Sequence, residues 1–148
     1  MEVTTLVIAI IGAITGLGSL AWQVVTWGQS GPVVAVTARQ SFPTFGDHLG
    51  DPHMSVTASN SGRSPVTVKG WGLRMLDGKT MVMPCNLSWS ASLPHRLEPG
   101  ADASWYMPTA EVQMFCAEHG IRHQDMTAFV NLADGGTINA RECGIGLA

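Results

Sequence analysis

The side chains best spaced for chemistry are one cysteine and two histidines. Cys116, His119 and His123 stand at i, i+3 and i+7, so an uninterrupted helix would bring them to one face. Zn²⁺ accepts thiolate and imidazole ligands, with a fourth ligand or water completing the set. Gly120 is equally well placed to end the helix, which leaves Cys116 and His119 on an apolar stripe. Because no CxxC or HExxH motif accompanies them, we predict core packing and no metal.

No other arrangement in the sequence indicates catalysis. His48 and His53 flank a loop that carries Asp47 and Asp51, which is more typical of a solvated loop than of a site. The serines lack the G-x-S-x-G context that activates a nucleophile. We therefore expect a protein that is not an enzyme and that uses no cofactor.

Two aromatic side chains are candidates for contact with a partner. Tyr106 and Phe129 stand opposite the core-facing positions of their alternating segments, so we predict that both are exposed. Four methionines form a second candidate surface, of the soft and adaptable kind, although their alternating segments favour the core: Met75, Met81, Met83 and Met107.

The rest of the chain is organised around an apolar run at residues 3–27. No charged residue occurs between Glu2 and Arg39, and a bilayer core needs about 20 apolar residues in a helix. Trp22 and Trp27 stand late in the run, where indole rings settle at the headgroup level. A small-x-small site at residues 19–21 resembles a signal-peptide cleavage site, but no Lys or Arg precedes the run. We predict an uncleaved transmembrane helix with membrane lipid as its first partner.

Small residues share one face of this predicted helix, at spacings of three and four. Such faces let two helix backbones approach closely in lipid, and a polar residue one turn later could hydrogen-bond across the pair. We predict a homo-oligomer, or a partner membrane protein, held through Ala9, Gly12, Gly16, Ser19 and Gln23.

Charge distribution favours one membrane topology and excludes one class of partner. All eight Lys and Arg residues follow the helix, and the three cysteines are an odd number, so a cytoplasmic domain at the cell membrane is favoured. An extracytoplasmic domain stays open. The net charge of −3, without a basic block, argues against nucleic-acid binding.

Beyond a linker at residues 28–32, residues 33–142 read as one β-rich domain, followed by a tail at 143–148. Clean alternation predicts strands at 53–60, 101–107 and 126–132. Strands are also expected at 33–40, 79–83, 87–93 and 137–141, with a loop at 42–52. In the strand at 65–76 the apolar parity switches between Val68 and Trp71, which predicts a β-bulge near Gly70. One short helix, capped by Thr109 and ended by Gly120, connects the last strands.

Short strands separated by turns, with a single connecting helix, predict a mainly β fold: a two-sheet sandwich behind an N-terminal transmembrane helix. The segment SVTASNSGRSPVTVKGWGL resembles the N-x-G-x-x-P-V-x-V strand–turn–strand of immunoglobulin-like bacterial sandwich domains. WQVVTWGQSGP and LPHRLEPGADASW resemble small, uncharacterised single-pass proteins of actinobacteria and their phages. The resemblance implies an anchored binding or spacer module and carries no activity.

These observations predict a membrane-anchored, non-enzymatic sandwich that binds or scaffolds a protein partner. Two alternatives stay open. One is a sensor or effector of stress or phage defence that clusters in the membrane. The other is an accessory subunit of a larger membrane complex or virion.

Overall fold

The structure, a computed structural model, describes residues 2–28, 30–82 and 87–141. It divides into two compact units, Met1–Gly31 and Pro32–Ala148. The first unit holds helix α1 (Glu2–Gly28). The described part of the second unit contains β1 (Val34–Ser41), β2 (Thr44–Phe45), β3 (His48–Leu49), β4 (His53–Asn60), β5 (Val66–Met75), β6 (Thr80–Val82), β7 (His95–Leu97), β8 (Asp102–Pro108), α2 (Thr109–His119), the 3₁₀ helix η1 (His123–Asp125), β9 (Met126–Leu132) and β10 (Thr137–Asn139).

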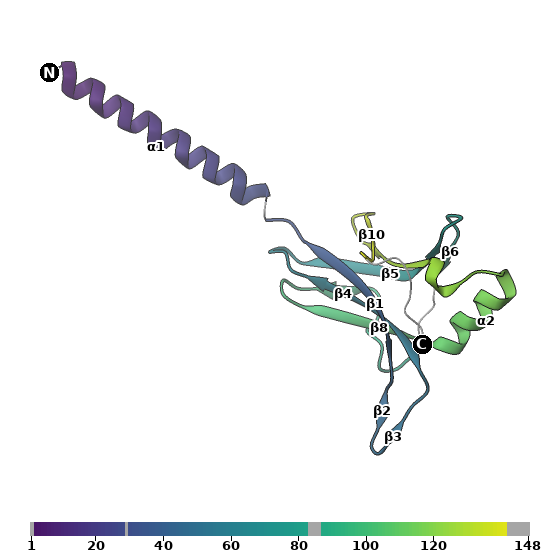
Figure 1. Cartoon of the computed structure of the whole chain (residues 1–148). Coiled ribbons are helices and arrows are strands. Elements are labelled where there is room, and N and C mark those ends of the chain that lie inside the picture. Colours follow the sequence, from purple (N-terminus) through teal and green to yellow (C-terminus); the bar gives the residue numbers. More distant parts are fainter. Residues whose placement is uncertain (1, 29, 83–86, 142–148) are drawn as a thin grey trace. The chain divides into compact units, whose positions relative to one another are not determined.

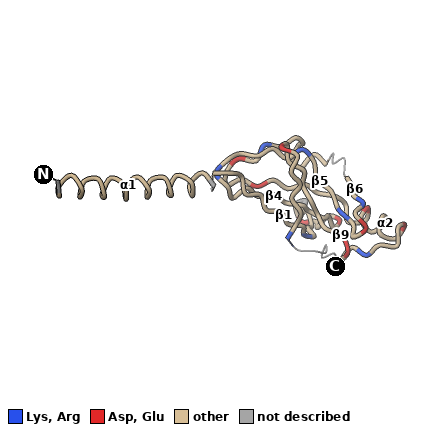
Figure 2. Tube along the Cα trace, turned by 90° about the horizontal axis from the view of Figure 1, so that it is seen from above, with Lys and Arg blue, Asp and Glu red and all other residues tan. Residues whose placement is uncertain are grey.

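Helix α1 coincides with the apolar run (Figure 1). No proline interrupts it, and the first one, Pro32, follows its end. Val3–Trp27 has a mean hydropathy of 2.1 and buries none of its most apolar stretch. Residues 3–27 carry no charge and are tan in Figure 2. Within the described residues, α1 is the one helix long and apolar enough to span a membrane.

Two antiparallel sheets enclose one core in the second unit. One sheet has the order β1–β4–β8 and the other β10–β9–β5–β6, with β7 also paired to β5. Trp71 and Trp105 are fully buried and come from opposite sheets. Val112 and Cys116 on α2 join the same cluster. The predicted mainly β fold behind an N-terminal helix is confirmed.

The predicted bulge in β5 is confirmed at the predicted place. The register between β5 and β9 shifts between Val68 and Gly70, and both Val68 and Trp71 are fully buried. The extra residue turns the odd-numbered apolar side chains back toward the core, which a regular strand would not do.

Phe129 is not an exposed aromatic contact, and that prediction is wrong. The side chain is only 2% exposed, although it points away from the main core. Its cross-strand partner is Gly72, which leaves space for the ring, and the Arg74 guanidinium lies over it at 5.2 Å from the ring centroid. The outer face of β9 is therefore covered from within the domain.

Four local predictions differ from the structure. Residues 42–52, predicted as a loop, contain the β2–β3 hairpin, which projects from the domain as an arm (Figure 1). Residues 87–93 contain no strand, and the Ser90 N–H instead bonds the carbonyl of Leu87 within a local turn. Strand β7 was not predicted, since it has three residues between two proline turns. Strand β10 ends at Asn139, before the predicted residue 141.

Thr109 was predicted to cap α2, and this is wrong because Thr109 is the first residue of the helix. Its backbone N–H donates to the carbonyl of Pro52 at 3.0 Å. Strand β8 ends at Pro108, so the helix follows it with no residue between them. Gly120 does end the helix in the left-handed conformation, with φ of 63°. The predicted strand end at Met83 and the tail at 143–148 lie outside the described residues.

Asn60, at the end of β4, ties together the segments around it. It is 1% exposed, and its side chain uses both donors and its acceptor oxygen. The oxygen accepts from the N–H groups of Val33 and Gly62 at 3.3 and 3.0 Å. The amide donates to the carbonyls of Ser64 and Leu97 at 2.8 and 3.2 Å. These four hydrogen bonds explain why asparagine stands at the first position of the N-x-G turn.

Candidate functional site

The described part of the second unit has a hollow of about 330 Å³ where β1 leads into the arm. This aromatic hollow is lined by Ser41, Phe42, Pro43, Thr44, Trp89 and Tyr106. Tyr106 belongs to β8, and Trp89 lies in the turn segment before β7. The hollow therefore joins three pieces of chain that are distant in the sequence.

The edge of β8 holds the segment that carries Trp89. The Ala91 N–H donates to the carbonyl of Ser104 at 3.1 Å, and the Tyr106 N–H donates to the Ser90 hydroxyl at 3.0 Å. These two bonds hold the two residues that follow Trp89 against the edge of β8. Trp89 is thus placed by a strand edge and not by a regular element of its own.

Three rings pack in a row beside the hollow. The Trp89 and Tyr106 ring centroids are 4.6 Å apart at an interplanar angle of 34°. The His53 ring meets Trp89 edge-on at 4.9 Å, and its Nδ1 lies 2.7 Å from the carbonyl oxygen of Asp51. Because a carbonyl only accepts, Nδ1 carries the proton. Such ring pairs contribute about 0.5–1.5 kcal/mol each, so these contacts help to hold the three rings together.

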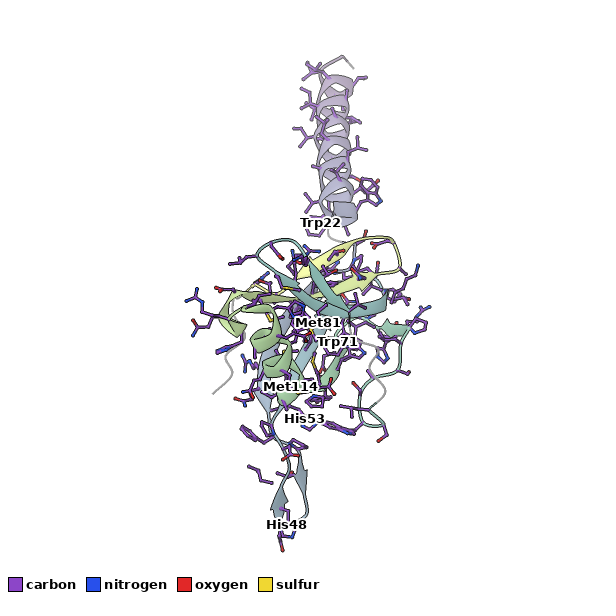
Figure 3. The ribbon with its side chains drawn as sticks, turned by 90° about the vertical axis from the view of Figure 1, so that its right-hand side faces the viewer. Trp22, His48, His53, Trp71, Met81 and Met114 are labelled. Atoms are coloured by element: carbon purple, nitrogen blue, oxygen red, sulfur yellow. The ribbon has the colours of Figure 1, made fainter. Side chains whose placement is uncertain are left out.

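The remaining lining of the hollow is the chain that leaves β1. The Ser41 hydroxyl donates to the carbonyl of His53 at 3.3 Å, and the Gly50 N–H closes the base of the arm on the carbonyl of Pro43 at 2.7 Å. Phe42 lies between these two bonds and is 48% exposed, while Trp89 is 40% exposed. Figure 3 shows His53 near the base of the arm and His48 at its tip.

The chemistry available in the hollow is contact and neutral hydrogen bonding. None of the six lining residues is Asp, Glu, Lys, Arg or His, and the phenol of Tyr106 is the one titratable group among them. The Ser41 hydroxyl already donates to the carbonyl of His53, so the lining offers mainly apolar and aromatic contact. The lining therefore fits an uncharged ligand.

The metal candidates are not brought together. Helix α2 ends at His119, so His123 lies beyond its last turn, in η1. Cys116 is buried with its Sγ 3.6 Å from the Met126 sulfur, and burial raises the pKa of its thiol, which disfavours the thiolate that binds metals. His119 stacks on the Phe115 ring at 4.2 Å. Within residues 2–28, 30–82 and 87–141, no group of three His, Cys, Asp or Glu side chains could hold an ion.

The predicted interface residues of α1 are exposed along the helix. The Gln23 side-chain amide donates to the Ser19 hydroxyl at 3.3 Å, so the two polar side chains on this face contact each other. A Cβ added at Gly12 or Gly16 would meet no described atom within 4 Å. Trp22 and Trp27, the predicted headgroup anchors, are 74% and 81% exposed.

Of the predicted contact residues, Tyr106 belongs to the hollow and Phe129 does not. Phe42 and Trp89 were missed, because both lie in segments without periodicity. The available signal was an aromatic residue flanked by two serines, Ser88 and Ser90, outside any alternating pattern.

Comparisons with known proteins add little to this geometry. No protein family matches the sequence, and no curated protein matches it. One similar solved structure is described as the X-ray structure of Northeast Structural Genomics Consortium target SoR45. It is 12% identical to this chain, with 76% of this chain and 82% of that chain covered, at a TM-score of 0.31. A likeness at this level carries no argument about function.

Proposed function

We propose that the chain is a non-enzymatic binding module anchored in the cell membrane. In this proposal α1 spans the bilayer and associates with a second copy through its small-residue face. The sheet domain lies on the cytoplasmic side and holds a protein partner in the aromatic hollow.

The observation that supports binding is the aromatic surface left open at the hollow. Phe42 and Trp89 are each about half exposed, and the bonds of the β8 edge and the arm base hold them in place. Aromatic side chains on a rigid frame are the usual anchors of protein interfaces. An uncharged lining with one phenol offers no acid–base pair for catalysis.

Tyr106→Ala is expected to reduce partner capture by at least about tenfold, because truncating an anchor aromatic costs about 2 kcal/mol or more. The full chain is purified in mild detergent, and the co-purifying proteins are quantified by mass spectrometry. The control is Leu76→Ala, which removes an 81% exposed side chain just after β5 and should leave capture unchanged. Equal capture by both variants would contradict the proposal.

Self-association is expected to fall by at least about tenfold when Gly12 and Gly16 are both changed to isoleucine, because branched side chains hold the backbones apart. Fluorescence energy transfer between labelled copies in vesicles measures it. The control pair, Ile10→Leu with Leu17→Ile, alters only exposed side chains of α1 outside the small-residue face. Unchanged transfer in the glycine double variant would show that this face is not the interface.

A further inference from the structure

We infer that His53 is the positioning residue of the aromatic hollow, and that its imidazole ring holds Trp89 in the place where the partner meets it. This inference rests on the proposed function and names a residue that acts on the hollow from outside its lining. Three observations carry it: the ring contacts of Trp89, the attachment of His53 to β4, and the place of His53 behind the indole.

Trp89 depends on its neighbours for its position, because residues 87–93 contain no strand. The two residues that follow it are bonded to the edge of β8, but these bonds position the backbone and do not select the rotamer of the indole. The side chain packs against two rings, Tyr106 at 4.6 Å and His53 at 4.9 Å between centroids. The orientation of the indole therefore depends on both rings.

The two supporting rings come from neighbouring strands of one sheet. The register pairs Tyr106 with Ser55 and His53 with Pro108, so the two aromatic side chains are diagonal neighbours, about 7–8 Å apart. The Trp89 ring contacts both of them and so bridges this diagonal. Loss of either ring leaves one side of the indole without its contact.

His53 has the firm attachment that a support requires. It is the first residue of β4 and pairs with Ser41 on β1 and with Pro108 on β8. The Ser41 hydroxyl donates to its carbonyl at 3.3 Å. Its Nδ1–H donates to the carbonyl of Asp51 at 2.7 Å, and such a bond sets the orientation of an imidazole. The ring is thus held in place from its own strand and from the base of the arm.

His53 acts on the hollow without lining it. Tyr106 both supports the indole and lines the hollow, so a change there affects two roles at once. The His53 side chain is not part of the lining, and the bond from Ser41 goes to its backbone carbonyl, which a side-chain change leaves in place. His53→Ala should therefore weaken partner capture only through Trp89. The expected loss is about two- to tenfold, the share of one ring pair.

The test measures the exposure of each indole in the full chain, labelled with 5-fluorotryptophan, in detergent micelles. A soluble gadolinium chelate broadens the fluorine line of an exposed indole, and Trp89→Phe identifies the line of residue 89. Broadening of this line should increase in His53→Ala and in His53→Asn, which keeps a donor for the Asp51 carbonyl but removes the ring. His53→Phe keeps a ring beside the indole and should restore the native broadening and the native capture.

Controls for the fold are present in the same spectrum. Trp71 and Trp105 are fully buried, so their lines should not change. If one of the two ring-removing variants alters these core lines, the other variant decides. His48→Ala, at the exposed tip of the arm (Figure 3), is the matched histidine control and should leave the line of residue 89 unchanged.

Each outcome decides the inference. A more exposed Trp89 in the ring-removing variants, weaker capture, and recovery of both in His53→Phe support it. An unchanged Trp89 line in His53→Ala overturns it, and so does a failure of His53→Phe to restore the line. Native capture by His53→Ala beside loss of capture in Tyr106→Ala also overturns it. Capture that neither variant reduces would contradict the proposed function, and the line of residue 89 alone would then decide whether His53 positions the indole.

Discussion

Replacing Asn60 with alanine is expected to lower the free energy of unfolding of the sheet domain by about 3–4 kcal/mol. The change deletes four hydrogen bonds to the backbone, each contributing about 1 kcal/mol net, and it leaves buried groups such as the Leu97 carbonyl without that partner. Domains are stable by only about 5–15 kcal/mol, so the melting temperature should fall by about 10–15 °C. Thermal unfolding followed by circular dichroism measures the loss.

Asn139→Ala is the matched control for Asn60→Ala. Asn139 is exposed, and its side chain accepts one hydrogen bond, from Arg74 at 3.3 Å. Its removal should change the stability by no more than about 0.5 kcal/mol. Equal melting temperatures for the two variants would show that Asn60 does not hold these segments together.

Gly72→Ala is expected to destabilise the domain by about 2–3 kcal/mol, the upper part of the range for overpacking a filled site. A Cβ at residue 72 would collide with the carbonyl oxygen of Met81 on β6 and lie 3.0 Å from Cζ of Phe129. The carbonyl is backbone and cannot swing away, so β6 or the ring must move. Chemical denaturation should show a lower midpoint with an unchanged slope.

Gly70→Ala tests whether the cost is specific to residue 72. Gly70 lies two residues earlier in β5, and a Cβ there meets no described atom within 4 Å. The same Gly-to-Ala change should then cost less than about 0.5 kcal/mol. A similar loss at both residues would attribute the effect to the backbone of the bulge and not to the Phe129 pocket.

The core of the fold could be predicted because its signals are local. The alternation in β4 appears directly as three fully buried side chains, Met54, Val56 and Ala58. The change of parity around Gly70 located the bulge, since Trp71 had to face the core. Likewise, the absence of charge over residues 3–27 predicted α1.

The predictions that failed depend on contacts between distant residues. Burial of Phe129 requires a glycine on the neighbouring strand and the guanidinium of Arg74 over the ring, and alternation within β9 carries no information about either. Strand β7 exists only because β5 offers a pairing edge. The β2–β3 arm has two residues per strand, too few for a period to be visible.

For the same reason, only part of the candidate site could be predicted from the sequence. Tyr106 was found because β8 alternates, and its outer face follows from the inner one. Trp89 reaches the hollow through hydrogen bonds from its neighbours to the edge of β8, which no pattern in residues 87–93 indicates. The position of Phe42 depends on the β2–β3 arm, and the residues of that arm were predicted as a loop.

The central claim is that an anchored chain holds a partner in its aromatic hollow, and photo-crosslinking in cells tests it most directly. p-Benzoylphenylalanine replaces Phe42, with Leu76 substituted in the same way as the control, and membranes are washed with alkaline carbonate after irradiation. We expect the chain in the washed membranes, with an adduct to another protein at position 42 and none at position 76. Release of the chain into the wash, or the absence of an adduct specific to position 42, would contradict the claim.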